Sequence, residues 1–176
     1  QEDIKLLNNF LKNIPYKIGK YAVKGNQDNH SFDAIFDNTD FVILNNEIVS
    51  IYNNTNESIN IIGLNNHVQE IKKDNDNYTI CLINNYDNYE KNHIKSNLVL
   101  SGHNLGGEIK FLDIPLIRKT THMENHFFDN NTEVFVSNGL GSIHHMRLFN
   151  HPSINVYRLL QKENNYFTKD NTIYLR

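Results

Sequence analysis

The chain has 176 residues and a mass of 20.6 kDa, and 39% of its residues are hydrophobic, which is enough for the core of one domain and excludes a disordered chain. Its net charge is −3 and its basic residues are scattered, so no nucleic-acid footprint is present. No run of about 18 apolar residues occurs, so we expect no membrane span, and the single cysteine, Cys81, excludes an internal disulfide framework.

Asparagine is unusually frequent, with 31 residues in the chain. Asn, Ile, Lys, Tyr and Phe all have codons rich in A and T, so an A/T-rich genome explains this bias without invoking function. Asn-x-Ser/Thr sequences arise by chance in such a chain and are not evidence of glycosylation.

The N-terminal part of the chain predicts two helices and four strands. Ile4, Leu7 and Leu11 share one face of the first helix, and Pro15 ends it. Ser31 is the expected cap of the second helix. The predicted elements are a helix over 3–14, a strand over 20–23, a helix over 31–36, and strands over 41–44, 47–52 and 58–62.

The rest of the chain predicts mainly strands. Residues 78–83 form an apolar run without alternation, which is typical of a buried strand. Residues 169–171 have the composition of a turn, so we expect a terminal hairpin over 166–175. The remaining predicted elements are a weak helix over 67–73 and strands over 97–100, 108–111, 133–136 and 154–160. The fold class is therefore α/β or α+β, in a single domain over 1–176.

Three predicted strands lead directly into loops rich in Gly and polar residues. Strand 20–23 leads to GNQD at 25–28, strand 78–83 to NNYD at 84–87, and strand 97–100 to SGHNLGGE at 101–108. Metal and catalytic groups favour loops at the carboxyl ends of buried strands. We therefore expect these three strands to end at a common edge, where the functional site lies.

These loops resemble those of the calcineurin-like metallophosphoesterases. SGHNLGGE at 101–108 resembles the Ser-Gly-His-Thr-His-Gly-Gly-Gln segment of that family, and YAVKGNQD at 21–28 resembles its strand followed by Gly-Asn-His-Asp. The segments VSNGLG at 136–141 and RLFNHP at 147–152 resemble the C-terminal stretch of its membrane-associated bacterial branch. The resemblance runs from about residue 4 to residue 160. It implies the C-terminal portion of a four-layer αββα sandwich with two metal ions, in a chain that we expect to be incomplete at its N-terminus.

The chain departs from the family pattern at most of the metal ligands. Asn26 and His103 match two retained ligands, which the resemblance assigns to the same metal ion. Asn84 replaces the family's lone His and offers only a weak oxygen ligand. Gln27 replaces a His that meets the leaving group or the phosphate, and Leu105 replaces a further His ligand. The family's Asp-x-His and Gly-Asp segments have no counterpart in the chain.

These substitutions weaken the chemistry that the resemblance implies. Two-metal hydrolysis uses one metal to activate water and both metals to hold the phosphoryl oxygens. Gln27 can donate a hydrogen bond but cannot deliver a proton near neutral pH, so we expect no catalytic residue. Any metal site would be a single weak one formed by Asn26, Asn84 and His103. We expect no cofactor for this chain alone, and the substrate-binding residues are unassigned.

Other histidines and the cysteine are interpreted as structural. His122 and His126 have the i, i+4 spacing of a helical zinc site, but nothing else indicates a helix there, so we interpret them as surface or packing residues. Cys81 lies in an apolar strand, where it is expected to be a small buried hydrophobic residue.

Three functions are compatible with this pattern. The first is a degenerate metallophosphoesterase-like domain that acts as a non-catalytic scaffold or interaction module. The second is a metal-dependent phosphoesterase, a hydrolase of phosphate mono- or diesters using Mn, Fe or Zn, that is completed by residues upstream of this chain. The third is a protein that binds a phosphorylated ligand without cleaving it. The losses at positions 27, 84 and 105 favour the first.

The expected partners follow from the missing part of the fold. A domain without the family's first strands leaves a sheet edge uncovered and core side chains exposed. We therefore expect self-association or a companion chain, and no nucleic acid. The cellular location stays open between the cytoplasm and the periphery of a membrane.

Overall fold

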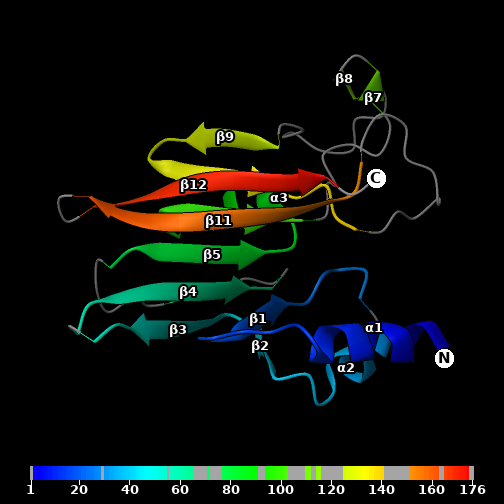
Figure 1. The fold of residues 1–176 in the computed structure, drawn as a ribbon. Helices are drawn as coiled ribbons and strands as arrows, with labels where there is room; N and C mark the ends of the chain where they lie inside the picture. Colours follow the sequence, from blue (N-terminus) through cyan, green and yellow to red (C-terminus); the bar gives the residue numbers. More distant parts are fainter. Residues whose placement is uncertain are drawn as a thin grey trace.

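The computed structural model describes residues 2–28, 30–54, 56–65, 71, 77–90, 94–102, 110–111, 114–115, 125–140, 151–162 and 165–174. Within these ranges the chain forms a mixed α/β fold (Figure 1). The elements in chain order are α1 (Glu2–Lys12), β1 (Lys20–Val23), α2 (Ser31–Phe36), β2 (Phe41–Leu44), β3 (Glu47–Tyr52), β4 (Ser58–Leu64), β5 (Thr79–Ile83), α3 (Tyr86–Glu90), β6 (Leu98–Ser101), β7 (Lys110–Phe111), β8 (Ile114–Pro115), β9 (His126–Asp129), β10 (Thr132–Val136), β11 (Ser153–Lys162) and β12 (Asn165–Tyr174).

A six-stranded mixed sheet forms the centre of the described structure, in the order β3-β4-β5-β6-β10-β9. Its four inner strands are parallel to one another, and β3 and β9 pair antiparallel at the two edges. The last residues of the parallel strands, Leu64, Ile83, Ser101 and Val136, lie in register. The loops that follow these strands therefore leave from one edge of the sheet.

One face of this sheet packs against α3 and forms the main hydrophobic core. Tyr86 and Tyr89 of α3 join a buried cluster with Cys81 and with apolar residues of β4, β5, β6 and β10. The ring of Phe127 on β9 meets Tyr86 edge-on, with centroids 5.1 Å apart. Cys81 is fully buried, which confirms its expected role as a small apolar core residue.

The opposite face of β4 is covered by the parallel pair β1–β2. Side chains alternate along a strand, and Ile62 and Leu64 face α3. A side chain at position 63 would therefore lie on the opposite face of β4. A Cβ atom at Gly63 would overlap Leu44 Cβ and lie 3.0 Å from Val23 Cγ1. Glycine at this position allows the two strand layers to approach closely.

The β11–β12 hairpin lies over the same face, across the sheet in Figure 1. Its two strands pair antiparallel over ten residue pairs. Tyr157 of β11 packs on Phe135 of β10 with ring centroids 4.6 Å apart, and the N–H of Ser153 donates to the carbonyl of Gly139 at 3.3 Å. These contacts hold the hairpin on the carboxyl half of the sheet.

Two helices cover the outer side of β1–β2. Phe36 of α2 packs edge-on against Phe41 of β2, with ring centroids 5.3 Å apart. Asn8 of α1 donates through Nδ2 to the carbonyls of Ile35 and Asp37, at 2.9 and 2.8 Å. Because the last carbonyls of a helix have no partner within it, Asn8 supplies hydrogen bonds that the C-terminal end of α2 requires.

A buried lysine joins α1 to the strands beneath it. Lys20 Nζ donates to the carbonyl of Leu11 at 3.2 Å and lies 5.0 Å from the ring centroid of Tyr16 and 5.1 Å from that of Phe41. A cation near the C-terminus of a helix interacts favourably with its dipole. The contacts of Lys20 therefore offset part of the cost of its burial.

Several predicted elements are confirmed, with the bounds 20–23, 31–36, 41–44 and 47–52 identical in the structure. The predicted strands over 58–62, 97–100, 133–136 and 154–160 are also present, each with shifted ends. The helix α3 and the strand β9 were not predicted. The weak helix over 67–73 lies outside the described residues except for residue 71.

Two sequence predictions are wrong. His30 rather than Ser31 precedes α2, and its backbone is already helical (φ −58°, ψ −19°), so Ser31 lies inside the helix rather than at its cap. Residues 169–171 lie within β12 and pair with residues 156–158 of β11, because cross-strand pairing outweighs their local turn preference. By contrast, the buried strand predicted over 78–83 is present as β5, in which three residues are buried and two are half-buried.

The longest helix in the described part of the chain, α1, has 11 residues. No described helix combines the length and the apolar character that crossing a membrane requires.

Candidate functional site

The three strand exits predicted to converge do meet, and Asn84 is the residue that joins them. The backbone N–H of Asn26, after β1, donates to Asn84 Oδ1 at 3.4 Å. The N–H of Gly102 and the hydroxyl of Ser101, at the end of β6, donate to the carbonyl of Asn84 at 3.1 and 3.3 Å. We call this meeting point of the loops after β1, β5 and β6 the strand-end junction.

The turn after β1 is closed by its own residues. The N–H of Gly25 donates to Asp28 Oδ2 at 2.7 Å, and the N–H of Asp28 donates to the carbonyl of Gly25 at 3.3 Å. Asn26 and Gln27 are at the exposed tip of this turn. Asp28 therefore holds the turn in place, and Asn26 and Gln27 are both exposed.

Gly25 fits closely against Asn84. A Cβ atom at Gly25 would lie 2.8 Å from Asn84 Nδ2 and 3.2 Å from both Asn84 Cγ and Asp28 Oδ2. A larger residue at position 25 would therefore push against the amide group of Asn84. Because the Asn84 amide lies against Gly25 and its Oδ1 accepts from Asn26, the Asn84 side chain connects two loops of the fold.

The described part of the junction brings together two of the predicted metal-site residues. Asn26 and Asn84 are neighbours, whereas His103 and Leu105 lie outside the described residues. Among the described residues, no group of three or more His, Cys, Asp or Glu side chains is placed to hold a metal ion. The chemistry available there is hydrogen bonding by neutral amides, with Asp28 bound to the Gly25 N–H.

A second amide cluster lies at the same edge and was not predicted. The N–H of Asn65, after β4, donates to Asn46 Oδ1 at 3.2 Å, and Asn65 Nδ2 donates to Asn45 Oδ1 at 2.5 Å. Asn46 has a left-handed backbone (φ 57°), which asparagine tolerates better than most residues. The signal for this cluster in the sequence was the Asn pair at 45–46 before β3 and a further asparagine, Asn65, directly after β4.

A groove of about 620 Å³ lies between these amide clusters. Its lining residues include Asn26, Asn45, Asn65 and Lys24. Lys24 Nζ lies 5.3 Å from the ring centroid of Phe32, a cation–π contact at the groove wall. Besides these amide and ammonium groups, the groove is lined by Asp33 and by the apolar residues Phe32, Ile43 and Leu44.

The loop after β10 is anchored by a buried asparagine. Asn138 Oδ1 accepts from Asn125 Nδ2 at 2.6 Å, and Asn138 Nδ2 donates to the carbonyl of His151 at 3.5 Å. The next residue, Gly139, donates its N–H to Ser137 Oγ at 3.0 Å and has a left-handed φ of 68°. This segment, one of those that carry the family resemblance, is fixed by polar contacts within the fold.

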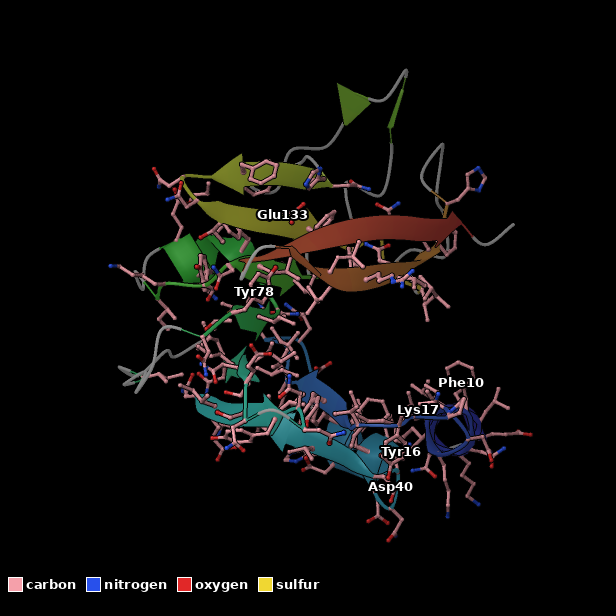
Figure 2. All side chains as sticks on the ribbon, turned by 60° about the vertical axis from the view of Figure 1, so that its left-hand side comes forward. Phe10, Tyr16, Lys17, Asp40, Tyr78 and Glu133 are labelled. Atoms are coloured by element: carbon pink, nitrogen blue, oxygen red, sulfur yellow. The ribbon has the colours of Figure 1, made fainter. Side chains whose placement is uncertain are left out.

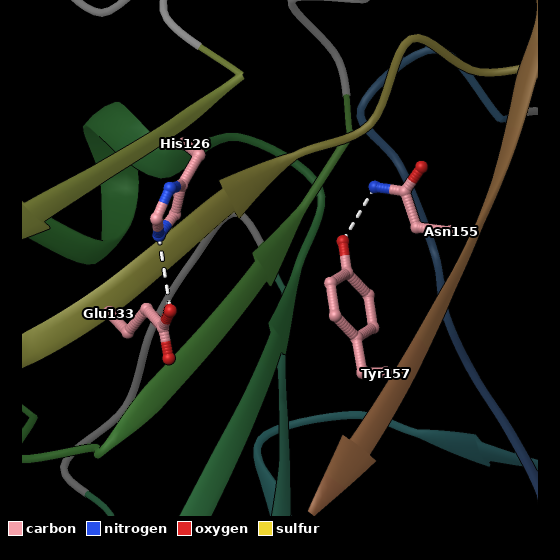
Figure 3. A network of polar contacts seen from close by, with 4 residues as sticks. All are labelled: His126, Glu133, Asn155 and Tyr157. Carbon is pink, nitrogen blue, oxygen red and sulfur yellow. Dashed lines mark hydrogen bonds and ion pairs between the residues drawn. The ribbon is translucent and has the colours of Figure 1, made fainter. Parts of the chain in front are cut away.

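Another polar cluster lies between the sheet and β11, away from the junction (Figure 3). His126 Nε2 lies 3.1 Å from Glu133 Oε1, and the His126 ring stacks on Phe135 with centroids 4.3 Å apart. Asn155 Nδ2 donates to the hydroxyl of Tyr157 at 2.5 Å. His126 opens strand β9 rather than lying on a helix, whereas His122 lies outside the described residues.

Two buried groups have pKa values far from neutral pH. Burial raises the pKa of the Tyr86 hydroxyl, and the hydrogen bond of that hydroxyl to Asp129 Oδ2, 2.7 Å long, raises it further. Burial likewise raises the pKa of the Cys81 thiol. Both groups therefore keep their protons near neutral pH.

Comparison with known proteins finds no match to the chain among family models, curated proteins or solved structures.

Proposed function

We propose that the chain is a degenerate metallophosphoesterase-like domain that acts as a non-catalytic scaffold or interaction module. One observation carries the proposal. Asn84, at the position of the family's lone His, uses Oδ1 to accept from the Asn26 N–H and lies with its amide against Gly25. A side chain engaged in this way contributes to the structure of the junction and is poorly placed to bind a metal.

The arrangement of elements supports the fold that belongs to this proposal. The core contacts place α3 on one face of the six-stranded sheet, and the contacts of Gly63 and Phe135 place β1–β2 and β11–β12 on the other. The contact between Phe36 and Phe41 places α2 outside β1–β2. This order of helix, sheet, second strand layer and helix is compatible with the C-terminal portion of a four-layer αββα sandwich.

The residue types at the junction support the absence of catalysis. Asn26 and Asn84 are neutral oxygen donors, and neutral ligands do little to offset the cost of dehydrating a divalent ion. Gln27 is exposed at the turn tip and cannot transfer a proton near neutral pH. Loss of one general acid costs about 10²–10⁴-fold in rate, before any loss of metal is counted.

Metal analysis and a turnover assay on the same preparation test this function. The purified chain is analysed for Mn, Fe and Zn, and its turnover of a chromogenic phosphodiester is measured with added Mn²⁺. We expect well under one metal ion per chain and no turnover above buffer. Two metal ions per chain, with turnover that is lost in His103→Ala, would overturn the proposal and establish the metal-dependent phosphoesterase instead.

Substitution of Asn84 tests the observation behind the proposal. We expect Asn84→Ala to lower the free energy of unfolding by about 1 kcal/mol, the net value of one hydrogen bond, and to leave metal content unchanged. The triple variant Gln27→His, Asn84→His and Leu105→His should raise metal content without producing turnover. Loss of bound metal in Asn84→Ala would show that Asn84 is a ligand and would contradict the proposal.

A further inference from the structure

The groove beside the strand-end junction has a volume of about 620 Å³ and lies at the carboxyl ends of β1 and β2. In Figure 2, Tyr16 and Asp40 mark the amino-end side of these two strands, so the groove is at the opposite end of the pair. Ligands of open α/β sheets bind outside the carboxyl ends of parallel strands, and a volume of this size suits a small molecule. We call it the β1–β2 groove, and its polar side chains include Lys24, Asn26, Asp33 and Asn45.

The walls of the β1–β2 groove are fixed by hydrogen bonds within the fold. On one wall, the N–H of Gly25 donates to Asp28 Oδ2 at 2.7 Å. On the other, the N–H of Asn65 donates to Asn46 Oδ1 at 3.2 Å, and Asn65 Nδ2 donates to Asn45 Oδ1. Because these loops are already ordered, a ligand that enters the groove pays little entropy to order them.

The groove carries one positive and one negative side chain, Lys24 and Asp33. Lys24 Nζ lies 5.3 Å from the ring centroid of Phe32, which also lines the groove. Within the described part of the chain, neither Lys24 nor Asp33 has an ion-pair partner. Asp33 disfavours a simple anion such as phosphate, and Lys24 disfavours a simple cation. The two charges together therefore fit a ligand that carries both a carboxylate and an ammonium group.

Two asparagines add neutral donors and acceptors to the groove. Among the described residues, Asn26 forms its hydrogen bond through the backbone N–H, and Asn45 forms its own through Oδ1. The side-chain amide of Asn26 and the NH₂ group of Asn45 therefore remain for a ligand. An amide side chain can pair with the C=O or the N–H of a peptide group, since it carries both donors and an acceptor. Ile43, half-buried in the same lining, supplies an apolar surface.

We propose that the β1–β2 groove binds a free di- or tripeptide. Lys24 pairs with the terminal carboxylate and Asp33 with the terminal ammonium group. Asn26 and Asn45 bind the peptide group, and an apolar side chain of the ligand packs on Ile43. Because Asp33 is exposed and water screens its charge, the Kd is on the order of 1 mM. A small zwitterionic ligand goes beyond the proposed function and does not depend on the family resemblance.

Two-dimensional NMR of the isotope-labelled chain tests the site, with the tripeptide Gly-Leu-Gly as the probe. We expect saturable shifts of the backbone amide signals of Gly25, Asn26 and Asn45 at peptide concentrations up to about 20 mM. The N-acetylated peptide lacks the ammonium group and the C-terminal amide lacks the carboxylate, so each should bind about three- to tenfold more weakly. No saturable shift, or equal binding of all three peptides, overturns the inference. Tighter binding of inorganic phosphate also overturns it, because the groove would then select an anion.

Two neutral substitutions test which residue recognises which end of the peptide. Lys24→Gln should abolish the difference in Kd between Gly-Leu-Gly and its C-terminal amide, and Asp33→Asn should abolish the difference between Gly-Leu-Gly and its acetylated form. Lys12→Gln and Asp37→Asn are the matched controls, because both residues are exposed outside the groove, and they should keep both differences. Thermal unfolding checks that each variant is folded. Retention of both differences in Lys24→Gln and Asp33→Asn overturns the inference. These readouts do not depend on metal content or turnover, so the peptide site and the proposed function fail separately.

Discussion

Replacing Gly63 by alanine should separate the two strand layers that position the junction. The added Cβ would overlap Leu44 Cβ and lie 3.0 Å from Val23 Cγ1 and 3.1 Å from Leu44 Cδ1. Carbon atoms pack best at about 3.5–4.0 Å, so β2 must move away from β4 by about an ångström. Leu44 is almost fully buried and its Cβ is fixed by the backbone, so rotation of the side chain cannot relieve the overlap.

The expected cost follows from these contacts. Overpacking of a core costs about 1–3 kcal/mol, and an overlap with a fixed Cβ belongs at the upper end. Removing a glycine returns about 0.4–1 kcal/mol by restricting the unfolded chain. We therefore expect Gly63→Ala to lower the free energy of unfolding by about 2 kcal/mol, which corresponds to a fall in Tm of about 4–8 °C.

Urea unfolding followed by circular dichroism measures this loss. With an m value of about 2 kcal/mol/M, the midpoint should fall by about 1 M at unchanged m. Gly102→Ala is one control, because its nearest neighbour, the carbonyl oxygen of Asn84, lies at an ordinary 3.8 Å. Gly19→Ala is the other, since its Cβ would meet only the movable end of the Tyr21 side chain. A Gly63→Ala variant as stable as both controls would refute the close packing of β2 on β4.

Three further predictions concern two buried titratable groups and one half-buried asparagine. The pKa of Tyr86 is raised above its ordinary value of 10.0, so above about pH 10 the unfolded chain loses this proton before the folded chain does. The free energy of unfolding should therefore fall by up to about 1.4 kcal/mol per pH unit, and the fall should be smaller in Tyr86→Phe. Equal pH profiles of unfolding for the two proteins would contradict this. The Cys81 thiol should react with a thiol reagent only after denaturation, and rapid modification of the native chain would disprove its burial. Asn8→Ala should lower the free energy of unfolding by about 1–2 kcal/mol, because the hydrogen bonds of Asn8 to the end of α2 are lost. Urea unfolding measures this loss, with Asn9→Ala as the control because Asn9 is exposed. Equal effects of the two substitutions would contradict the role of Asn8 at the end of α2.

The fold could be predicted from sequence where local pattern and tertiary structure agree. The strands over 20–23, 41–44 and 47–52 are bounded by turn residues, and their bounds are correct. The turn predicted at 169–171 failed because those residues gain a full set of cross-strand partners in β12. The prediction of Ser31 as a cap was wrong because the helical backbone already begins at His30. The residue type at position 31 does not show where the helical backbone begins.

The candidate site was predictable in outline only. The prediction that the loops after strands 20–23 and 78–83 meet is correct for Asn26 and Asn84, although β1 and β5 belong to two different sheets. The use of Asn84 Oδ1 by the Asn26 backbone depends on how closely β1 approaches β5, and this distance is set by tertiary contacts such as Gly63 against Leu44. Sequence spacing does not contain that information.

The buried Asn138 in the loop after β10 also affects the chemical stability of this asparagine-rich chain. Asn138–Gly139 is the one Asn-Gly pair in the sequence, and such pairs deamidate when the glycine nitrogen attacks the asparagine side chain. Here Asn138 is buried with its amide bound to Asn125 and His151, and the Gly139 N–H is bound to Ser137 Oγ. The attacking nitrogen and its target are both held in hydrogen bonds, so succinimide formation must wait for local opening of this loop. The rate of Asn138 deamidation therefore reports how often the strand end beneath β11 opens.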